Sequence, residues 1–270
     1  MLDFLAEIPF PDIDPVALRI FGFEVRWYGI SYVAAFLLAS SLLKRLSREK
    51  LLPLAEKDVG DLIFFAMLGT ILGGRLGYVL FYKPAHYFAH PAEILQVWHG
   101  GLSFHGGLLG VVAALFLFAR KRGASIPRVL DCAAVAVPPG IFCVRLANFV
   151  NGELWGRPTD LSIGMVFPAA EAGGVPRHPS QLYEAAWEGL ALFGIMWWAR
   201  KQRMAQHPGA LSGLFLLAYG CGRFVIEFAR EPDRHLGTVL GPFSMGQVLC
   251  AAMIALGAYC WAKAMRRTAP

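Results

Sequence analysis

Long apolar stretches alternate with short polar segments along the whole chain. A transmembrane helix needs about 17 to 25 predominantly apolar residues to cross the hydrocarbon core of a bilayer. Seven stretches meet this requirement: Trp27 to Leu43, Leu62 to Phe81, Gly101 to Ala119, Val129 to Val150, Leu182 to Ala199, Leu211 to Phe228 and Phe243 to Ala262. The pattern therefore predicts an all-α integral membrane protein with seven transmembrane helices.

The composition agrees with a lipid environment. Apolar residues make up 56% of the 270 residues and charged residues only 16%, whereas soluble domains have about 45 to 50% apolar and about 25% charged residues. The cysteines all fall within predicted spans and lack the spacing of a metal site. We expect them to be small core residues rather than ligands or disulfides: Cys132, Cys143, Cys221, Cys250 and Cys260.

Basic residues concentrate on one side of the predicted spans. The loops after the first, third and fifth spans and the C-terminal tail carry fifteen lysines and arginines, and the opposite side carries seven. Because Lys and Arg in short loops are retained in the cytoplasm, the N-terminus is predicted to lie outside and the C-terminus in the cytoplasm. The net charge of +6 then reflects topology, and we expect no nucleic-acid partner.

The segments between spans are expected to form a small head on the outer side. We predict a single polytopic membrane domain over residues 1–270, with external segments 1–26, 82–100, 151–180 and 230–242. Alternating polar and apolar residues around Gly22 predict a hairpin between Leu18 and Trp27. The long segment from Glu153 to Pro179 is rich in Gly and Pro, and its length without regular structure predicts a lid or gate over the site.

Several spans contain polar side chains that a lipid-facing helix would exclude. Arg145 and Asn148 lie three residues apart in the fourth span, and Tyr219, Arg223 and Glu227 recur every four residues in the sixth. An ionisable residue at the bilayer centre costs about 2.5 to 3.5 kcal/mol on insertion scales, so such residues usually face an internal cavity. With the assigned orientation they share the outer half of the membrane with others from further spans: Tyr28, Arg75, His105 and Glu184. We predict one polar chamber that opens outward.

Simpler interpretations exist for single members of this set. Tyr28 is at a position where aromatic residues commonly anchor a helix to the membrane interface. His105 is flanked by glycine pairs and could be a packing residue, and Arg223 with Glu227 could be a self-contained ion pair. The common depth of these residues favours a shared site over three unrelated explanations.

The content of the chamber suggests its ligand. Two or three arginines with few acidic residues nearby favour an anion, and planar guanidinium groups match phosphate oxygens. The spans contain no cluster of metal ligands, and the chain has no phosphate-binding Gly-Lys-Ser loop and no Gly-x-Ser-x-Gly nucleophile turn. We therefore predict an anionic lipid headgroup as ligand, with no metal and no cofactor.

Four motifs resemble those of the bacterial prolipoprotein diacylglyceryl transferase family. They are His105-Gly106-Gly107-Leu108, Arg145-x-Ala147-Asn148-Phe149-x-Asn151-x-Glu153-x-x-Gly156, His178-Pro179-Ser180-Gln181-Leu182-Tyr183-Glu184 and Tyr219-x-x-x-Arg223-Phe224-x-x-Glu227-Phe228-x-Arg230-Glu231-Pro232-Asp233. The resemblance covers the chain length, the Arg26-Trp27-Tyr28-Gly29 entrance and the number of spans. One position departs from the family pattern, because Val144 stands where the family usually has Gly.

The resemblance implies transfer of a diacylglyceryl group from phosphatidylglycerol to the lipobox cysteine thiol of prolipoproteins, with release of glycerol phosphate. It implies a location in the bacterial cytoplasmic (inner) membrane, with the head and the active site on the periplasmic side. We expect a monomer.

The resemblance also suggests roles for the polar residues. Arg145 and Arg223 would stabilise the charge on the leaving phosphate, His105 would accept the thiol proton, and Tyr219 would position the headgroup or relay a proton. Headgroup binding is assigned to Tyr28, Asn148 and Asn151. Glu153 and Glu227 would orient the arginines, and Gly156 would allow a tight turn at the mouth.

Two other classes of function remain open from the sequence. A transporter or flippase for an anionic lipid or solute would need a polar path through the whole membrane, but the cytoplasmic halves of the spans are apolar. A structural membrane scaffold would leave the outer arginines and His105 without a task.

Overall fold

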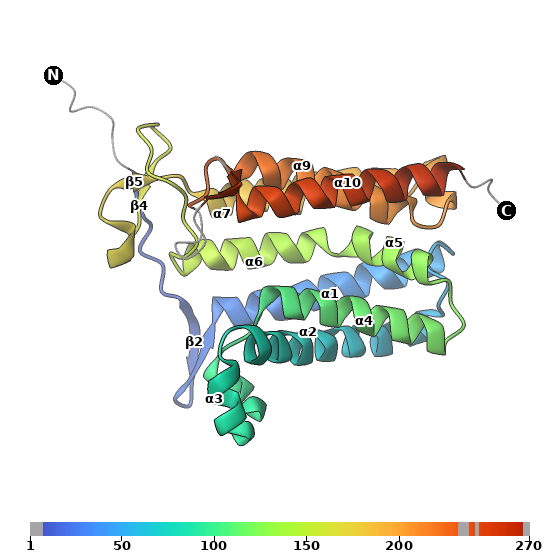
Figure 1. Cartoon of the computed structure of the whole chain (residues 1–270), viewed down its shortest axis with the longest axis horizontal. Helices are drawn as coiled ribbons and strands as arrows, with labels where there is room; N and C mark the ends of the chain where they lie inside the picture. Colours follow the sequence, from blue (N-terminus) through green and yellow to red (C-terminus); the bar gives the residue numbers. More distant parts are fainter. Residues whose placement is uncertain (1–7, 232–237, 241–242, 267–270) are drawn as a thin grey trace. The chain divides into compact units, whose positions relative to one another are not determined.

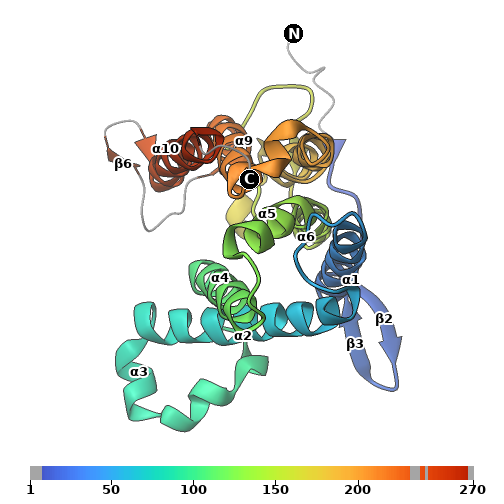
Figure 2. The same cartoon turned by 90° about the vertical axis from the view of Figure 1, so that its right-hand side faces the viewer.

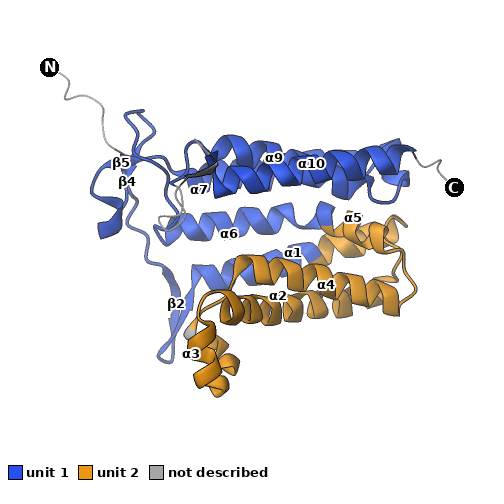
Figure 3. Ribbon diagram, viewed as in Figure 1, with its two compact units in different colours: residues 1–39, 134–270 blue, residues 40–133 orange. Residues whose placement is uncertain are grey.

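The computed structural model describes residues 8–231, 238–240 and 243–266. It is mostly helical and separates into two compact units, Met1–Ala39 with Ala134–Pro270 and Ser40–Ala133 (Figure 3). Parts of two predicted external segments lie outside the described residues, namely 1–7, 232–237 and 241–242.

Helices occupy each of the predicted spans within the described residues. Four of them are long and apolar enough to cross a membrane: α1 (Trp27–Arg48), α2 (Val59–Phe81), α4 (Phe104–Lys121) and α10 (Met245–Arg266). The pair α5 (Ile126–Ala136) and α6 (Pro138–Val150) would make a fifth span, bent by 41°. The bend agrees with Pro138-Pro139, since proline at the first turn of a helix removes backbone donors and breaks the preceding helix. Seven spans and their orientation stay predictions.

The two remaining predicted spans are interrupted or short. The fifth consists of α7 (Ser180–Glu184), a π-helical stretch η5 (Ala185–Ala191) and α8 (Leu192–Ala199). The sixth is α9 (Ala210–Ile226), an apolar helix of 17 residues. In the first unit, α9 lies beside α10, as Figures 1 and 2 show. Glycines on both helices allow close approach, because an ideal Cβ on Gly213 would lie 2.6 Å from the backbone nitrogen of Trp261.

In the second unit, α2 and α4 pack along a line of glycines. A Cβ added to Gly106 or Gly110 of α4 would overlap backbone atoms of Gly73 or Gly69 of α2, so only glycine fits at these contacts. Ser103 caps α4, its hydroxyl accepting a hydrogen bond from the backbone nitrogen of Gly106. The loop between the two helices folds into α3 (Pro84–Ala89), η2 (Pro91–Leu95) and η3 (Val97–His99).

The polar segments of the first unit form small sheets. The predicted hairpin is confirmed as β2 (Val16–Ile20) paired antiparallel with β3 (Phe23–Arg26). Phe21 and Gly22 turn the chain with φ of 49° and 84°, a left-handed pair typical of two-residue hairpins. A second sheet joins β1 (Ile8–Pro9), β4 (Met165–Val166) and β5 (Pro176–Arg177).

The expectation that residues 153 to 179 lack regular structure is wrong, whereas their role as a lid or gate over the site stays a prediction. Besides β4 and β5, the segment contains η4 (Ala170–Ala172) and a fully packed Phe167, which contacts the rings of Phe10 and Trp155. Arg177 also stabilises the segment, because its guanidinium donates hydrogen bonds to the carbonyl oxygens of Ala172 and Gly156 at 2.7 and 3.1 Å. Glycine and proline content therefore marked turns in an ordered segment.

Candidate active site

The first unit contains a buried cluster of arginines and glutamates drawn from α6, α7, η5 and α9. Arg145 projects from α6 to two carboxylates of the neighbouring helix. Its Nε lies 2.7 Å from Glu184 Oε2, and its Nη2 lies 3.2 Å from Glu188 Oε2. The backbones come close at Gly189, where an added Cβ would lie 2.6 Å from Phe142 Cβ. Glycine therefore brings α6 near enough for Arg145 to reach both acids.

Arg223 joins the same carboxylates from α9. Its Nη1 donates a hydrogen bond to Glu184 Oε1 and lies 3.6 Å from Glu188 Oε1, while its Nη2 lies 2.9 Å from Glu227 Oε2. Arg230, which follows the end of α9, reaches Glu184 Oε1 at 2.9 Å. Glu184 thus contacts three guanidinium groups at once.

Glu227 is held in turn by the start of the last helix. The hydroxyl of Ser244 donates to Glu227 Oε1 at 2.9 Å. A Cβ on Gly246 would overlap the same carboxylate, so the absence of a side chain there makes room for it. Gln247 accepts a hydrogen bond from the backbone nitrogen of Ser244 at 3.1 Å. The predicted orienting role of Glu227 has a matching contact, since it binds Arg223 directly.

The expectation of few acidic residues around the arginines is wrong. Three arginines face three carboxylates, and Glu184 and Glu188 are both 0% exposed. Charges removed from water need partners and hydrogen bonds to offset the lost solvation. The guanidinium groups are therefore fixed by fully buried acids rather than left as a diffuse positive patch.

The roles assigned from the sequence left out residues that the cluster uses. Glu188, Arg230 and Ser244 make contacts within it. Glu184 was predicted to line the chamber but was given no role, and it contacts three arginines. The spacing of Glu184 and Glu188, four residues apart in an apolar span, was the available signal for the two acids. Nothing in the local sequence indicated Ser244, because its contact depends on the packing of α10 against α9. The π-helical stretch that carries Glu188 is a feature often found at functional sites.

A second polar group lies at the C-terminal end of α6. The side-chain nitrogens of Asn148 and Asn151 lie 2.8 and 3.4 Å from Glu153 Oε1. Glycine at 152, with φ of 63°, and Leu154, with φ of 60°, turn the chain back so that Glu153 faces the helix it has just left. Glu153 was expected to orient an arginine, but its carboxylate contacts the two asparagine amides.

Gly156 has a steric role that differs from the predicted tight turn. Its φ is not positive, and the left-handed residues nearby are Gly152 and Leu154. A Cβ on Gly156 would overlap the carbonyl oxygen of Ala229 and lie 2.7 Å from His178 Cβ. Its backbone nitrogen donates to the carbonyl of His178 at 2.8 Å. Gly156 is therefore required where the segment passes between the end of α9 and residue 178.

The aromatic members of the predicted site lie in the first unit as well. Tyr219 is one helical turn before Arg223 on α9, with its ring stacked on Phe215 at 5.8 Å. Tyr28 is the second residue of α1, and its ring centroid lies 5.3 Å from that of Tyr32. The indole of Trp187 crosses α9 at Gly222, where a Cβ would overlap it, and donates to the carbonyl of Ala218 at 3.1 Å. This contact holds η5 against α9 at Gly222, the residue that precedes Arg223.

His105 belongs to the second unit, as does Arg75. It lies on the first turn of α4, is exposed, and its ring contacts Phe104 at 5.6 Å. Arg75, predicted to share the chamber, instead donates to four backbone carbonyls of the loop between α2 and α4. That His105 lies close to Arg145 and Arg223 in one site stays a prediction.

A further histidine of the first unit, His178, comes just before α7, the helix that carries Glu184. Nδ1 of His178 is 3.1 Å from the hydroxyl of Tyr183. Burial lowers the pKa of the His178 imidazole below its ordinary value of 6.5, because a partly desolvated ring disfavours the protonated form. His178 is therefore biased toward the neutral state.

The helices and the buried arginine–glutamate cluster define a polytopic membrane protein with a polar site. The family model of prolipoprotein diacylglyceryl transferase matches residues 15–263. The chain belongs to this family and is a transferase. A phosphatidylglycerol–prolipoprotein diacylglyceryl transferase of Bordetella bronchiseptica is 49% identical over 253 residues, covering 93% of this chain and 95% of the relative. Relatives with the same name from Cupriavidus pinatubonensis and Rhodospirillum rubrum are each 50% identical, over 96% and 94% of this chain and 94% and 93% of their own lengths.

Proposed function

We propose that this enzyme transfers the diacylglyceryl group of phosphatidylglycerol to the lipobox cysteine of prolipoproteins. The observation that carries the proposal is the buried cluster around Glu184, which holds three arginines in fixed positions within a family whose named relatives use these two substrates. We place the enzyme in the bacterial inner membrane as a monomeric polytopic domain of seven spans, with its site on the periplasmic side.

The reaction forms one bond and breaks another at the same carbon. The cysteine sulfur attacks the glycerol carbon that carries the phosphodiester, a C–S thioether bond forms, and the C–O bond to phosphate breaks. The leaving group is glycerol phosphate, whose phosphate changes from a singly charged diester to a monoester with up to two negative charges. The thiol proton passes to a base. Negative charge therefore grows on the phosphate as the bond breaks.

The arginines suit this change in charge. Arg145 uses Nε and Nη2 for the carboxylates, which leaves Nη1 available to a phosphate oxygen. Donors that are already oriented before the reaction stabilise developing charge at little reorganisation cost. Glu184, Glu188 and Glu227 would orient the arginines in this way and still leave them within reach of the phosphate. Arg230, which contacts Glu184, is a further candidate for the clamp.

The asparagine group suits the hydroxyls of the headgroup. Asn148 is 3% exposed, and its Oδ1 has no hydrogen-bond partner among the described residues. A buried acceptor left unpaired costs about 1 to 3 kcal/mol, so a glycerol hydroxyl that donates to it would gain that energy on binding. Asn151, Glu153 and Tyr28 would make the other proposed contacts with the headgroup. Tyr219 would position the phosphate. Gly156 would keep the entrance of the site in shape through its close approach to Ala229 and His178.

His105 is the proposed base. A cysteine thiol has an ordinary pKa of about 8.5, so deprotonation by an imidazole would increase the fraction of thiolate at neutral pH. His105→Gln, which keeps a similar shape, is expected to reduce transfer by about 100-fold or more. Transfer at the wild-type rate by this variant would remove His105 from the mechanism.

The test of the proposed function uses purified protein, phosphatidylglycerol and a synthetic lipobox peptide. We expect the peptide to gain the mass of one diacylglyceryl group and glycerol phosphate to appear in equal amount. A peptide with Ser in place of Cys is the matched control and should remain unmodified. Lack of modification by protein that unfolds cooperatively would refute the assignment, and loss of transfer in Arg145→Ala and Arg223→Ala would support the clamp.

A further inference from the structure

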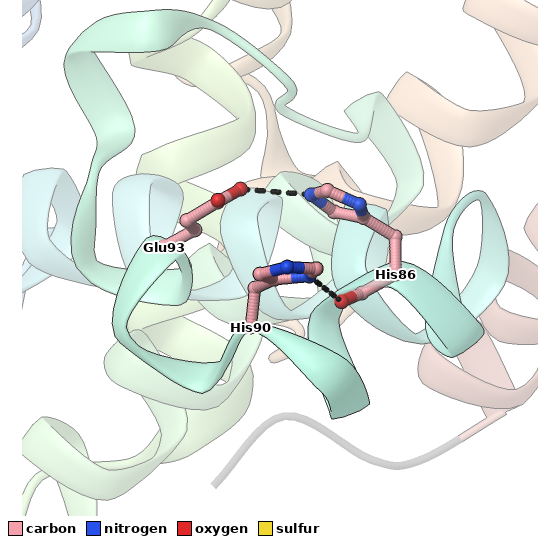
Figure 4. Close-up of side chains that lie close together, drawn as sticks. All are labelled: His86, His90 and Glu93. Atoms are coloured by element: carbon pink, nitrogen blue, oxygen red, sulfur yellow. Dashed lines mark hydrogen bonds and ion pairs between the residues drawn. The ribbon is translucent and has the colours of Figure 1, made fainter.

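The loop between α2 and α4 contains a group of side chains that the proposed transfer does not use. His86, His90 and Glu93 each bring one possible ligand atom to within 4.8 Å of the other two. His86 belongs to α3, His90 directly follows that helix, and Glu93 lies in η2. Figure 4 shows the His86 imidazole and the Glu93 carboxylate pointing toward each other, with the His90 ring beside them. Three donors of the types that bind transition metals thus converge outside the predicted spans.

The two histidines have orientations that suit metal binding. His86 Nε2 lies 2.8 Å from Glu93 Oε2, and the His86 and His90 rings stack with centroids 4.9 Å apart. Nδ1 of His90 lies 3.2 Å from the backbone carbonyl oxygen of His86. When Nδ1–H donates to this carbonyl, the ring lone pair is on Nε2. Metal-binding histidines commonly have this arrangement, in which the second nitrogen donates to a carbonyl or carboxylate.

Arg75 of α2 fixes both segments that carry the ligands. The residue is 5% exposed, and its guanidinium donates to the carbonyl oxygens of Glu93 and Ile94 at 2.6 and 2.9 Å. Its Cζ also lies 5.0 Å from the ring centroid of Tyr87, a buried residue of α3. The backbone segments that carry the donors therefore share a common support, which lowers the entropy lost when the donors bind an ion.

The spacing is compatible with a tetrahedral ion after small rotations. Zn²⁺ binds nitrogen and oxygen at about 2.0 to 2.2 Å, so its ligand atoms lie about 3.4 Å apart. The His86 to Glu93 pair at 2.8 Å would open slightly, and the widest pair, within 4.8 Å, would close. The side chains of His86 and Glu93 are 47% and 41% exposed, so packed neighbours do not block such small rotations.

We propose that His86, His90 and Glu93 bind one Zn²⁺ ion, with water in the fourth position. Two neutral imidazoles and one carboxylate are a ligand set typical of zinc with an open coordination position. The ion would stabilise the loop rather than take part in group transfer. Arg75 also donates to the carbonyls of Gly100 and Gly101 at 2.7 and 3.2 Å, so the same support extends to the segment that leads into α4.

The proposal is tested on the full chain purified through a tag without histidine and treated with a chelator. Calorimetric titration with Zn²⁺ should give one ion per chain, and Co²⁺ should give the visible absorption bands of a tetrahedral nitrogen and oxygen site. His86→Ala, His90→Ala and Glu93→Gln should each weaken Zn²⁺ binding by at least about tenfold, since loss of even a supporting partner of a ligand costs about 10 to 100-fold. His207→Ala, outside the cluster, is the matched control and should bind as wild type does.

Thermal unfolding separates loss of the site from loss of the fold. Zn²⁺ should raise the melting temperature of the wild type and of His207→Ala, because a ligand that binds only the folded state stabilises it. The three cluster variants should keep the metal-free melting temperature but lose this increase. Absence of saturable Zn²⁺ binding to the wild type, or equal affinity in His86→Ala and His207→Ala, would overturn the proposal.

Discussion

Replacing Glu184 by Gln tests whether charge balance holds the arginine cluster together. Glu184 is 0% exposed and contacts Arg145 at 2.7 Å, Arg230 at 2.9 Å and Arg223 through a further hydrogen bond. Glutamine keeps the shape of the side chain but removes its charge, so three partly buried arginines would face two carboxylates. Removing one partner of a buried ion pair costs about 3 to 5 kcal/mol.

We expect this loss of free energy to be measurable as a lower melting temperature and as a lower rate of transfer. A loss of 1 kcal/mol lowers the melting temperature of a protein of about 150 to 250 residues by about 2 to 4 °C, so we expect a decrease of about 6 to 20 °C. Displacement of a positioning group by about 1 Å costs about 100-fold in rate, and Arg145 and Arg223 would both shift. The assays are unfolding in detergent and transfer to a lipobox peptide followed by mass spectrometry.

Two further variants identify charge as the cause. Asp160→Asn removes a carboxylate charge in the same way at an exposed position and should leave both measurements unchanged. Arg230→Gln combined with Glu184→Gln restores equal numbers of opposite charges, so the double variant should be more stable than Glu184→Gln alone. Equal melting temperatures for Glu184→Gln and Asp160→Asn, or no recovery in the double variant, would refute the reasoning.

Three other predictions follow from close contacts and from one titrating group. Gly222→Ala would place a Cβ inside the Trp187 indole, so we expect a loss of about 1 to 3 kcal/mol or more by thermal unfolding; an unchanged melting temperature would contradict the packing of η5 on α9. Gly156→Ala would overlap the Ala229 carbonyl and should abolish most transfer to the lipobox peptide, and full activity would show that the close approach is dispensable. Because the pKa of His178 is lowered from 6.5 in the folded state, the unfolded chain binds more protons just below that pH, and stability should rise with pH up to about 6.5 and then level off. His178→Asn should lose this component in melting curves measured across pH, and a profile identical to the wild type would exclude the effect.

The predictable part of the site came from residues that share a helix. Arg145 with Asn148 in α6, and Arg223 in α9 with Glu227 at its C-terminal cap, have helical spacing, so the sequence alone put each pair on a common face. The acids were harder to assign. Glu184 and Glu188 have helical spacing, but their contacts with Arg145 and Arg223 depend on which faces of α6, η5 and α9 meet. Glycines determine which faces pack together. Gly189 lets η5 approach Phe142 of α6, and Gly222 lets the Trp187 indole of η5 cross α9.

The sequence by itself determined the class of environment, the positions of the helices, the hairpin at Gly22 and the family, because apolar length, turn residues and dense motifs are local properties of the chain. Only the tertiary structure decided the charge balance of the site, the steric role of Gly156 and the contact of Glu153 with two asparagines. It also gave order to residues 153 to 179 and brought His86, His90 and Glu93 together. The charge balance and the role of Gly156 depend on distances between segments that are remote in sequence. The contacts of Glu153 and of the His86, His90 and Glu93 group join neighbours in sequence, but they depend on turns and loop geometry that no helical or strand periodicity encodes.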